Sequence, residues 1–167
     1  MKQLTHYNTH FHKRTFPITL ICDDISSGLN VGSLLRISDA FGVEKVIFCG
    51  NHIPMGRKMV KTSRSTEKYV SYELSKNILE VIGGYKNSHL LLGLEITSNS
   101  LPIKEFTFET EKPLALIIGN ENFGISEEVL KHLDQTVHIT MYGQNSSMNV
   151  VQATTVALYE ITKQFSS

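Results

Sequence analysis

The sequence predicts an α/β protein with a mostly parallel sheet that is flanked by helices. Short apolar runs bounded by turn residues recur along the 167 residues, and stretches with helical spacing lie between them. Strands that alternate with helices form βα units, so these runs are expected to pair in parallel and to be covered on both faces. Five runs are predicted to be strands, at residues 18–22, 45–49, 90–94, 114–118 and 137–141.

Four stretches carry apolar or small residues at helical spacing. The clearest is the last, in which residues 150, 153, 154, 157, 158 and 161 follow the pattern of one buried helix face. The other three cover residues 31–38, 74–82 and 129–133. Gly42 is expected to end the first helix, and Ser126 and Asn149 have the side chains that favour the start of the later ones.

The length predicts a single domain at residues 17–167, preceded by an irregular polar arm at residues 1–16. No apolar run is long enough for a membrane span, and no signal peptide opens the chain. The two cysteines, Cys22 and Cys49, are expected to be buried thiols in a reducing compartment, so a cytoplasmic location is predicted. No convincing metal-binding cluster is present, because a single His-x-His pair is a weak signal.

The net charge of zero argues mildly against nucleic acid as a partner, but the charge is unevenly distributed. The densest basic group contains one acidic residue, Glu67, and five basic residues: Arg57, Lys58, Lys61, Arg64 and Lys68. A second basic group lies near the N-terminus and contains His10, His12, Lys13 and Arg14. Charge alone leaves open whether either group binds a polyanion or is only a solvated surface.

Loops that follow strands are the expected place for a ligand site in such a sheet, because ligands bind outside the carboxyl ends of the strands. The loop after the first strand leads to Asn30 and Arg36, and the loop at 117–130 contains Glu121 between two glycines. The loop at 142–149 is a run of polar residues before the last helix. Each residue also has an ordinary interpretation, since Asn30 could cap a helix and Arg36 and Glu121 could be surface charges.

Taken together, the three loops resemble the SpoU (TrmH) family of RNA ribose 2′-O-methyltransferases, which belongs to the SPOUT superfamily. The first motif is matched by Asn30, Gly32 and Arg36, and the second, G-x-E-x-x-G, by Gly119, Glu121 and Gly124. The third is matched by ITMYG at 139–143 and SMNV at 147–150. The resemblance covers about residues 17–164, and the chain departs from it at Thr140, where the family has proline, and at Met148, where it has leucine.

The resemblance implies a deep trefoil knot at the C-terminus, S-adenosylmethionine as cofactor, and a homodimer with the active site built across the subunit interface. It implies cofactor contacts at Leu94, Gly119, Ile139, Met141, Ser147 and Met148. It also implies a catalytic group made of Arg36, Asn30, Glu121, Ser147 and Asn149. Within this group Arg36 is expected to hold a phosphate and stabilise the developing alkoxide, and Glu121 is expected to pair with it or to bind substrate.

The expected substrate is RNA, with tRNA favoured over ribosomal RNA because the chain resembles the minimal members of the family. The basic group at 57–68 is expected to lie on a loop after the strand at 45–49 and to bind this RNA. The alternative is an RNA-binding protein of the same fold without catalytic activity. A Rossmann-type methyltransferase acting on protein or a small molecule is disfavoured, because the Gly-rich turn after the first strand is missing. A serine hydrolase is disfavoured because the GxSxG motif is missing.

Overall fold

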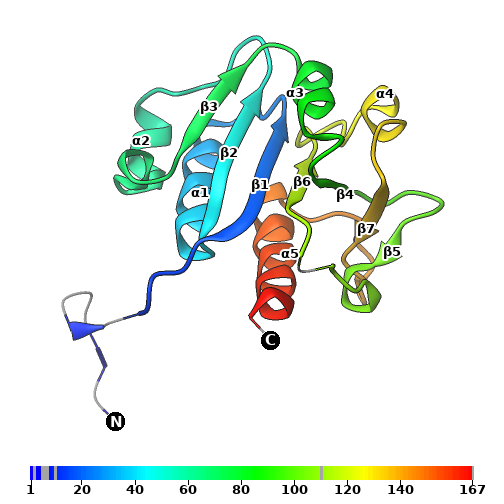
Figure 1. The fold of residues 1–167 in the computed structure, drawn as a ribbon. Coiled ribbons are helices and arrows are strands. Elements are labelled where there is room, and N and C mark those ends of the chain that lie inside the picture. Colours follow the sequence, from blue (N-terminus) through cyan, green and yellow to red (C-terminus); the bar gives the residue numbers. More distant parts are fainter. Residues whose placement is uncertain (2, 5–7, 10, 110, 167) are drawn as a thin grey trace.

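A seven-stranded parallel sheet forms the centre of the computed structural model, which describes residues 1, 3–4, 8–9, 11–109 and 111–166 (Figure 1). The order of the strands is β3-β2-β1-β6-β4-β7-β5, and each neighbouring pair is parallel. The predicted mostly parallel sheet is therefore confirmed. In chain order the strands are β1 Phe16–Asp23, β2 Val43–Cys49, β3 Tyr72–Ser75, β4 Leu90–Leu94, β5 Leu101–Pro102, β6 Leu114–Ile118 and β7 Gln135–His138.

Helices cover both faces of this sheet. On one face lie α1 Gly28–Ala40, α2 Arg57–Ser63 and α5 Val150–Phe165, and on the other lie α3 Ile78–Tyr85 and α4 Glu127–Leu130 (Figure 1). Two single turns of 3-10 helix, η2 Thr66–Lys68 and η3 Ile103–Glu105, complete the described elements. No helix in the described ranges has the length and apolar character that crossing a membrane requires.

The central strands are buried on both sides, as the apolar runs predicted. In β6, Leu116 and Ile118 pack toward α1 and α5, whereas Ala115 and Ile117 pack toward α3 and α4. Cys22 and Cys49 are free thiols buried at the ends of β1 and β2, which confirms the prediction that they are buried thiols. Burial raises the pKa of Cys49 to about 12, so this thiol stays protonated at neutral pH.

Several boundaries differ from the prediction. The run at 137–141 ends as a strand at His138, so Ile139 and Met141 belong to the following loop. Leu74, assigned to a helix by its spacing, lies in the edge strand β3, and the helix starts at Ile78 after the Asn77 cap. β3 and β5 are short edge strands with few buried residues, so their sequences lack the apolar run by which the inner strands were recognised.

The basic segment was expected to be a loop, and this expectation is wrong. Residues 57–63 form α2, because Met59 and Ser63 lie one turn apart and are both buried against the neighbouring helix α1. The contact is close at Gly32 of α1, where an added Cβ would lie 2.3 Å from the Met59 carbonyl oxygen. The five basic side chains of the segment point to solvent and are exposed.

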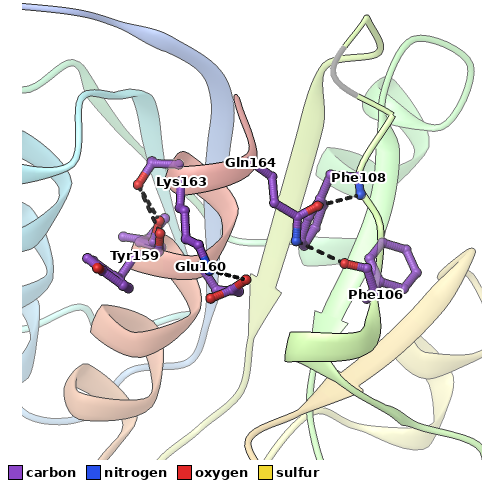
Figure 2. A network of polar contacts seen from close by, with 8 residues as sticks. Phe106, Phe108, Tyr159, Glu160, Lys163 and Gln164 are labelled. Carbon is purple, nitrogen blue, oxygen red and sulfur yellow. Dashed lines mark hydrogen bonds and ion pairs between the residues drawn. The ribbon is translucent and has the colours of Figure 1, made fainter. Parts of the chain in front are cut away.

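The last helix is held at its C-terminal end by two contacts with distant segments. The Gln164 side-chain amide donates to the Phe106 carbonyl (3.0 Å) and accepts from the Phe108 N–H (3.0 Å), as Figure 2 shows. Arg14 donates to the Phe165 carbonyl at 2.7 Å, so the end of the N-terminal arm is fixed to α5. Before this anchor residues 11–13 form no helix or strand, and β1 begins at Phe16, the last residue of the predicted arm.

Candidate functional site

The carboxyl ends of four adjacent strands, β1, β6, β4 and β7, bring the loops of all three sequence motifs to one edge of the sheet. The loop after β1 leads into α1, whose first turn contains Asn30. The loop after β6 carries Gly119, Glu121 and Gly124, and the loop after β7 runs to Asn149 at the start of α5. The strand order thus explains why motifs about 90 and 120 residues apart in the chain can meet.

The Glu121 carboxylate joins the second motif to the first. One oxygen, Oε1, accepts from the Asn30 side-chain amide at 2.8 Å and from the Ser27 N–H at 3.1 Å. The other, Oε2, accepts from the backbone N–H and the hydroxyl of Ser26, both at 3.0 Å. Because the N-terminus of a helix favours negative charge, this carboxylate from a distant loop completes the start of α1.

The same bonds affect the acidity of Glu121. Partial burial by itself would raise the pKa of this carboxyl, but the hydrogen bonds donated by Ser26 and Asn30 favour the charged form and lower its pKa overall. Glu121 is therefore an anion at neutral pH. Its expected pairing with Arg36 is not found within the described chain, where its side-chain bonds go to Ser26, Ser27 and Asn30.

Asn149 joins the third motif to the other two. Its side-chain oxygen accepts from the N–H groups of Val151 (2.9 Å) and Gln152 (3.4 Å), which confirms that it caps α5. Its amide nitrogen donates to the Asn30 side-chain oxygen at 3.4 Å. Asn30 itself lies inside the first turn of α1 and is not its cap, so its amide is free to connect Glu121 with Asn149.

A cleft of about 900 Å³ lies between these loops. All six residues predicted to contact a cofactor line it, and so do Asn30, Glu121 and Asn149. Its apolar wall includes Leu94, Ile118 and Ile139, and its polar wall includes two carboxylates, Glu95 and Glu121. The volume is within the usual range for small-molecule sites, and the mixed lining suits a ligand with an aromatic ring and positive charge.

Gly119 and Gly124 allow the second loop to fold tightly beside the cleft. A Cβ at Gly119 would lie 2.1 Å from the Gly124 carbonyl carbon, so no side chain fits there. Gly124 has φ +66°, a conformation that glycine adopts without strain. The structure therefore explains why glycine occupies both ends of the G-x-E-x-x-G motif. At these two positions, backbone atoms and not side chains border the cleft.

Two residues that the sequence did not single out also belong to the site. Glu95 follows β4 and accepts from the Ile125 N–H at 3.0 Å, which fixes the end of the second loop. His138 lines the cleft, and its Nδ1 lies 2.9 Å from the Ser100 hydroxyl. The position of Glu95 directly after a predicted strand was a usable signal, whereas nothing in the sequence distinguished His138.

Thr140, where the family has proline, adds a hydroxyl to the loop after β7. Its Oγ1 is buried and has no hydrogen-bond partner in the described part of the chain. A buried hydroxyl without a partner is costly, and it lies between Ile139 and Met141, which both line the cleft. No group of three or more His, Cys, Asp or Glu side chains suited to a metal ion occurs among the described residues.

Arg36 lies apart from the cleft of its own chain. It is exposed on α1 in a stripe with Leu29, the half-buried Ser33 and Ala40, at spacings of three or four residues. Asn30 lies elsewhere around the helix, since six residues correspond to about 240° of rotation. The predicted catalytic group is thus divided, with Asn30, Glu121, Ser147 and Asn149 at the cleft and Arg36 outside its lining.

The five basic residues of the 57–68 segment are also divided. Arg57 and Lys58 line a second hollow, of about 490 Å³, together with Ser26, Ser27 and Gly28. Ser26 and Ser27 are the residues that Glu121 binds, so this hollow adjoins the site. Lys61, Arg64 and Lys68 lie outside both linings, and none of the five forms an ion pair with a described residue.

Comparison with known proteins identifies relatives along nearly the whole chain. Residues 17–159 match the SpoU rRNA Methylase family. The tRNA (guanosine(18)-2'-O)-methyltransferase of Aquifex aeolicus is 26% identical over 166 residues, which cover 98% of this chain and 77% of that protein. The 23S rRNA (guanosine-2'-O-)-methyltransferase RlmB of Haemophilus ducreyi is 28% identical over 170 residues, which cover 98% of this chain and 67% of that one.

The fold agrees with solved structures of such proteins. The SpoU methyltransferase AviRb from Streptomyces viridochromogenes, in complex with the cofactor AdoMet, superposes with a TM-score of 0.79 at 28% identity. The match covers 89% of this chain and 60% of that one. The chain thus spans between about three fifths and three quarters of the length of these relatives.

The role of Glu121 in joining the loops can be tested by replacing it with glutamine. Because its pKa is lower in the folded chain, the carboxylate stabilises the fold above its unfolded pKa, and this contribution is lost as the pH falls through the folded value. At pH 7, Glu121→Gln should lower the free energy of unfolding by roughly 1–3 kcal/mol, measured by urea unfolding. The difference should shrink as the pH is lowered through the folded-state pKa of Glu121.

The matched control is Glu111→Gln, which removes an exposed carboxylate that forms no hydrogen bond to a distant loop within the described part of the chain. It should change stability little at pH 7 and at lower pH. A Glu121→Gln variant as stable as wild type at pH 7 would show that the carboxylate does not hold the loops together.

Proposed function

Because the chain belongs to the SpoU rRNA methylase family, we propose that it transfers a methyl group from S-adenosylmethionine to a ribose 2′-hydroxyl of RNA. The observation that carries the proposal is the cleft, in which the three motif loops meet around the Glu121, Asn30 and Asn149 contacts. Relatives named as 2'-O-methyltransferases of tRNA and of 23S rRNA, and a neighbour in complex with AdoMet, support it.

The lining of the cleft fits S-adenosylmethionine. Leu94, Ile139 and Met148 offer apolar surface for the adenine, and the carboxylates of Glu95 and Glu121 suit a positively charged ligand. When bound, this cofactor supplies an activated methyl group on its sulfonium, so the protein mainly has to align the reactants and assist loss of the hydroxyl proton. Asn30 and Asn149 would keep the loops in the orientation that this alignment requires.

We propose that the protein works as a homodimer and that Arg36 acts in the cleft of the second copy. The exposed stripe of α1 that contains Arg36 lies on the same sheet face as α5, and the two helices are in contact. α5 exposes Gln152, Val156, Tyr159 and Lys163 at helical spacing, with Val156 43% and Tyr159 62% exposed. Exposed apolar and aromatic side chains next to charged ones suit burial against another chain.

In this arrangement Arg36 would hold the RNA phosphate and stabilise the negative charge that develops on the 2′-oxygen. A guanidinium keeps its proton throughout the working pH range, so it serves as an electrostatic clamp and not as a base. Its planar fork can bind two phosphate oxygens at once, which a lysine cannot do.

The favoured RNA is tRNA. tRNA (guanosine(18)-2'-O)-methyltransferases of Aquifex aeolicus and Escherichia coli are among the relatives of the chain, which supports this choice, and a relative that acts on 23S rRNA matches the chain to a similar extent. An RNA substrate and two free, buried cysteines together support a cytoplasmic location. We further propose the C-terminal trefoil knot of the family, and the bonds from Gln164 to the 106–108 segment would fix α5 in it (Figure 2).

Because Arg36 lies apart from the cleft, substituting it should affect turnover without affecting cofactor binding, which gives a sharp test of this function. Arg36→Ala should lower turnover by about 100-fold or more, comparable to loss of a preorganised donor to the reacting oxygen. Arg36→Lys should also have a low turnover, because lysine cannot present a planar fork to the phosphate. The affinity for S-adenosylmethionine, measured by calorimetry, should not change. Lys104→Ala, which removes an exposed charge from η3, is the control and should keep full turnover.

Mixing two inactive variants tests whether Arg36 acts across the interface. Arg36→Ala has an intact cleft, and Ser147→Trp has a blocked cleft but an intact Arg36. After the subunits exchange, a 1:1 mixture should recover about a quarter of wild-type turnover, because half of the dimers then hold one complete site. No recovery would place Arg36 in its own cleft. Cofactor binding by wild type without transfer to any RNA would instead favour an RNA-binding protein without catalysis.

The basic segment predicts a particular dependence of RNA binding on salt. If Lys61 and Arg64 contact phosphates, the double variant Lys61→Gln, Arg64→Gln should weaken tRNA binding and flatten the plot of log affinity against log salt by about 1–2 units. A control with the same charge change, Lys104→Gln, Lys112→Gln, should leave the slope unaltered. Equal slopes for wild type and the first variant would mean that the segment is only a solvated surface. The RNA path would then be sought along the N-terminal group, of which His10 lies outside the described residues.

A further inference from the structure

The loop after β6 exposes an aromatic ring at the cleft. Phe123 is 88% exposed, although it lines the same cleft as Asn30, Glu121 and Asn149. It occupies a variable position of the G-x-E-x-x-G motif, so the motif does not explain it. An aromatic ring at this level of exposure does not gain the free energy that its burial would provide, so it contributes little to the stability of the fold.

The ring is held outward by a loop with many internal bonds. The Asn120 side-chain oxygen accepts from the N–H groups of Asn122 (2.8 Å) and Phe123 (3.3 Å). The backbones of Asn120 and Gly124 form two hydrogen bonds with each other, of 3.1 and 2.9 Å. Glu121 ties the loop to α1, and Glu95 ties Ile125 to β4. The backbone under Phe123 is therefore fixed before any ligand arrives.

An exposed aromatic ring on a fixed loop is the kind of group on which a nucleobase stacks. RNA is recognised largely through unpaired bases that stack on aromatic side chains, and such stacking tolerates different bases. A ribose whose 2′-hydroxyl enters the cleft carries its base, and the bases of adjacent nucleotides, to the rim where Phe123 lies. A ring on a fixed backbone would bind a base at a smaller entropic cost than a ring on a mobile loop.

We propose that Phe123 is a stacking platform for a nucleobase of the RNA substrate, at or next to the methylated nucleotide. This inference rests on the proposed function, because it requires RNA at the cleft. The ring recognises the flat face of a base rather than its hydrogen-bonding edge. It therefore contributes to the affinity for unpaired RNA, and other groups must select the base.

The absence of tryptophan from the chain allows a direct test, since Phe123→Trp creates its sole tryptophan. The larger ring keeps the ability to stack, and its fluorescence can be excited separately from tyrosine. Titration with unmodified tRNA should quench the emission in a saturable manner. Leu74→Trp is the matched control, because Leu74 is 54% exposed on β3, at the opposite edge of the sheet from β7 and β5. Its emission should change little.

Kinetics then separate stacking from simple apolar contact. Phe123→Leu should raise the KM for tRNA by roughly 5- to 150-fold, the range expected for loss of one stacked base, and should leave the affinity for S-adenosylmethionine unchanged. Phe123→Tyr should remain close to wild type. An unchanged KM for Phe123→Leu, or a Phe123→Trp emission that does not respond to tRNA, would overturn the proposal.

Sedimentation of the same variants tests whether a second copy of the chain, and not a nucleobase, covers the Phe123 ring. If Phe123→Leu dissociates the dimer, the ring is covered by a second copy and the proposal is wrong. Failure of the proposed function gives a different result, since wild type itself would then transfer no methyl group to RNA. If wild type is active and Phe123→Leu has the same KM for tRNA, only the stacking platform is rejected, and the proposed function stands.

Discussion

The site depends on the carboxylate of Glu121, which lies where three loops from distant parts of the chain must meet. Its two oxygens accept hydrogen bonds from donors at the start of α1, among them the Asn30 amide. The Asn30 side-chain oxygen in turn accepts from Asn149 at the start of α5. These bonds bring two helix N-termini and the loop after β6 to one edge of the sheet. The strand order makes this meeting possible, and the Glu121 contacts determine the relative placement of the loops that border the cleft.

The same arrangement leaves Arg36 outside the cleft of its own chain. The residues that hold the loops together lie on one side of the first turn of α1, whereas Arg36 lies in an exposed stripe further along the helix. The division suits an enzyme whose cofactor cleft is formed within one subunit and whose phosphate clamp comes from another. In the proposed mechanism the division also separates stability from chemistry, because the residues that stabilise the loops differ from Arg36, the proposed phosphate clamp.

Much of this could be predicted from the sequence, because the inner strands are continuous apolar runs and the motif residues follow them in order. The edge strands β3 and β5 and the short helix α2 could not, because each has few buried residues and depends on a neighbour for its stability. The candidate site was identified largely through the motifs. The partners of Glu121 were not foreseen, since bonds such as that from Asn30, 91 residues earlier, depend on the tertiary structure.

The central claim, methyl transfer to an RNA ribose, is tested most directly by mapping the 2′-O-methyl nucleotides of cellular RNA. Total RNA from a strain without this gene would be compared with RNA from the parent strain and from the deletion strain complemented with the wild-type chain. The account predicts that one 2′-O-methylated nucleotide is missing in the deletion strain and returns on complementation. Identical modification maps in all three strains would contradict it.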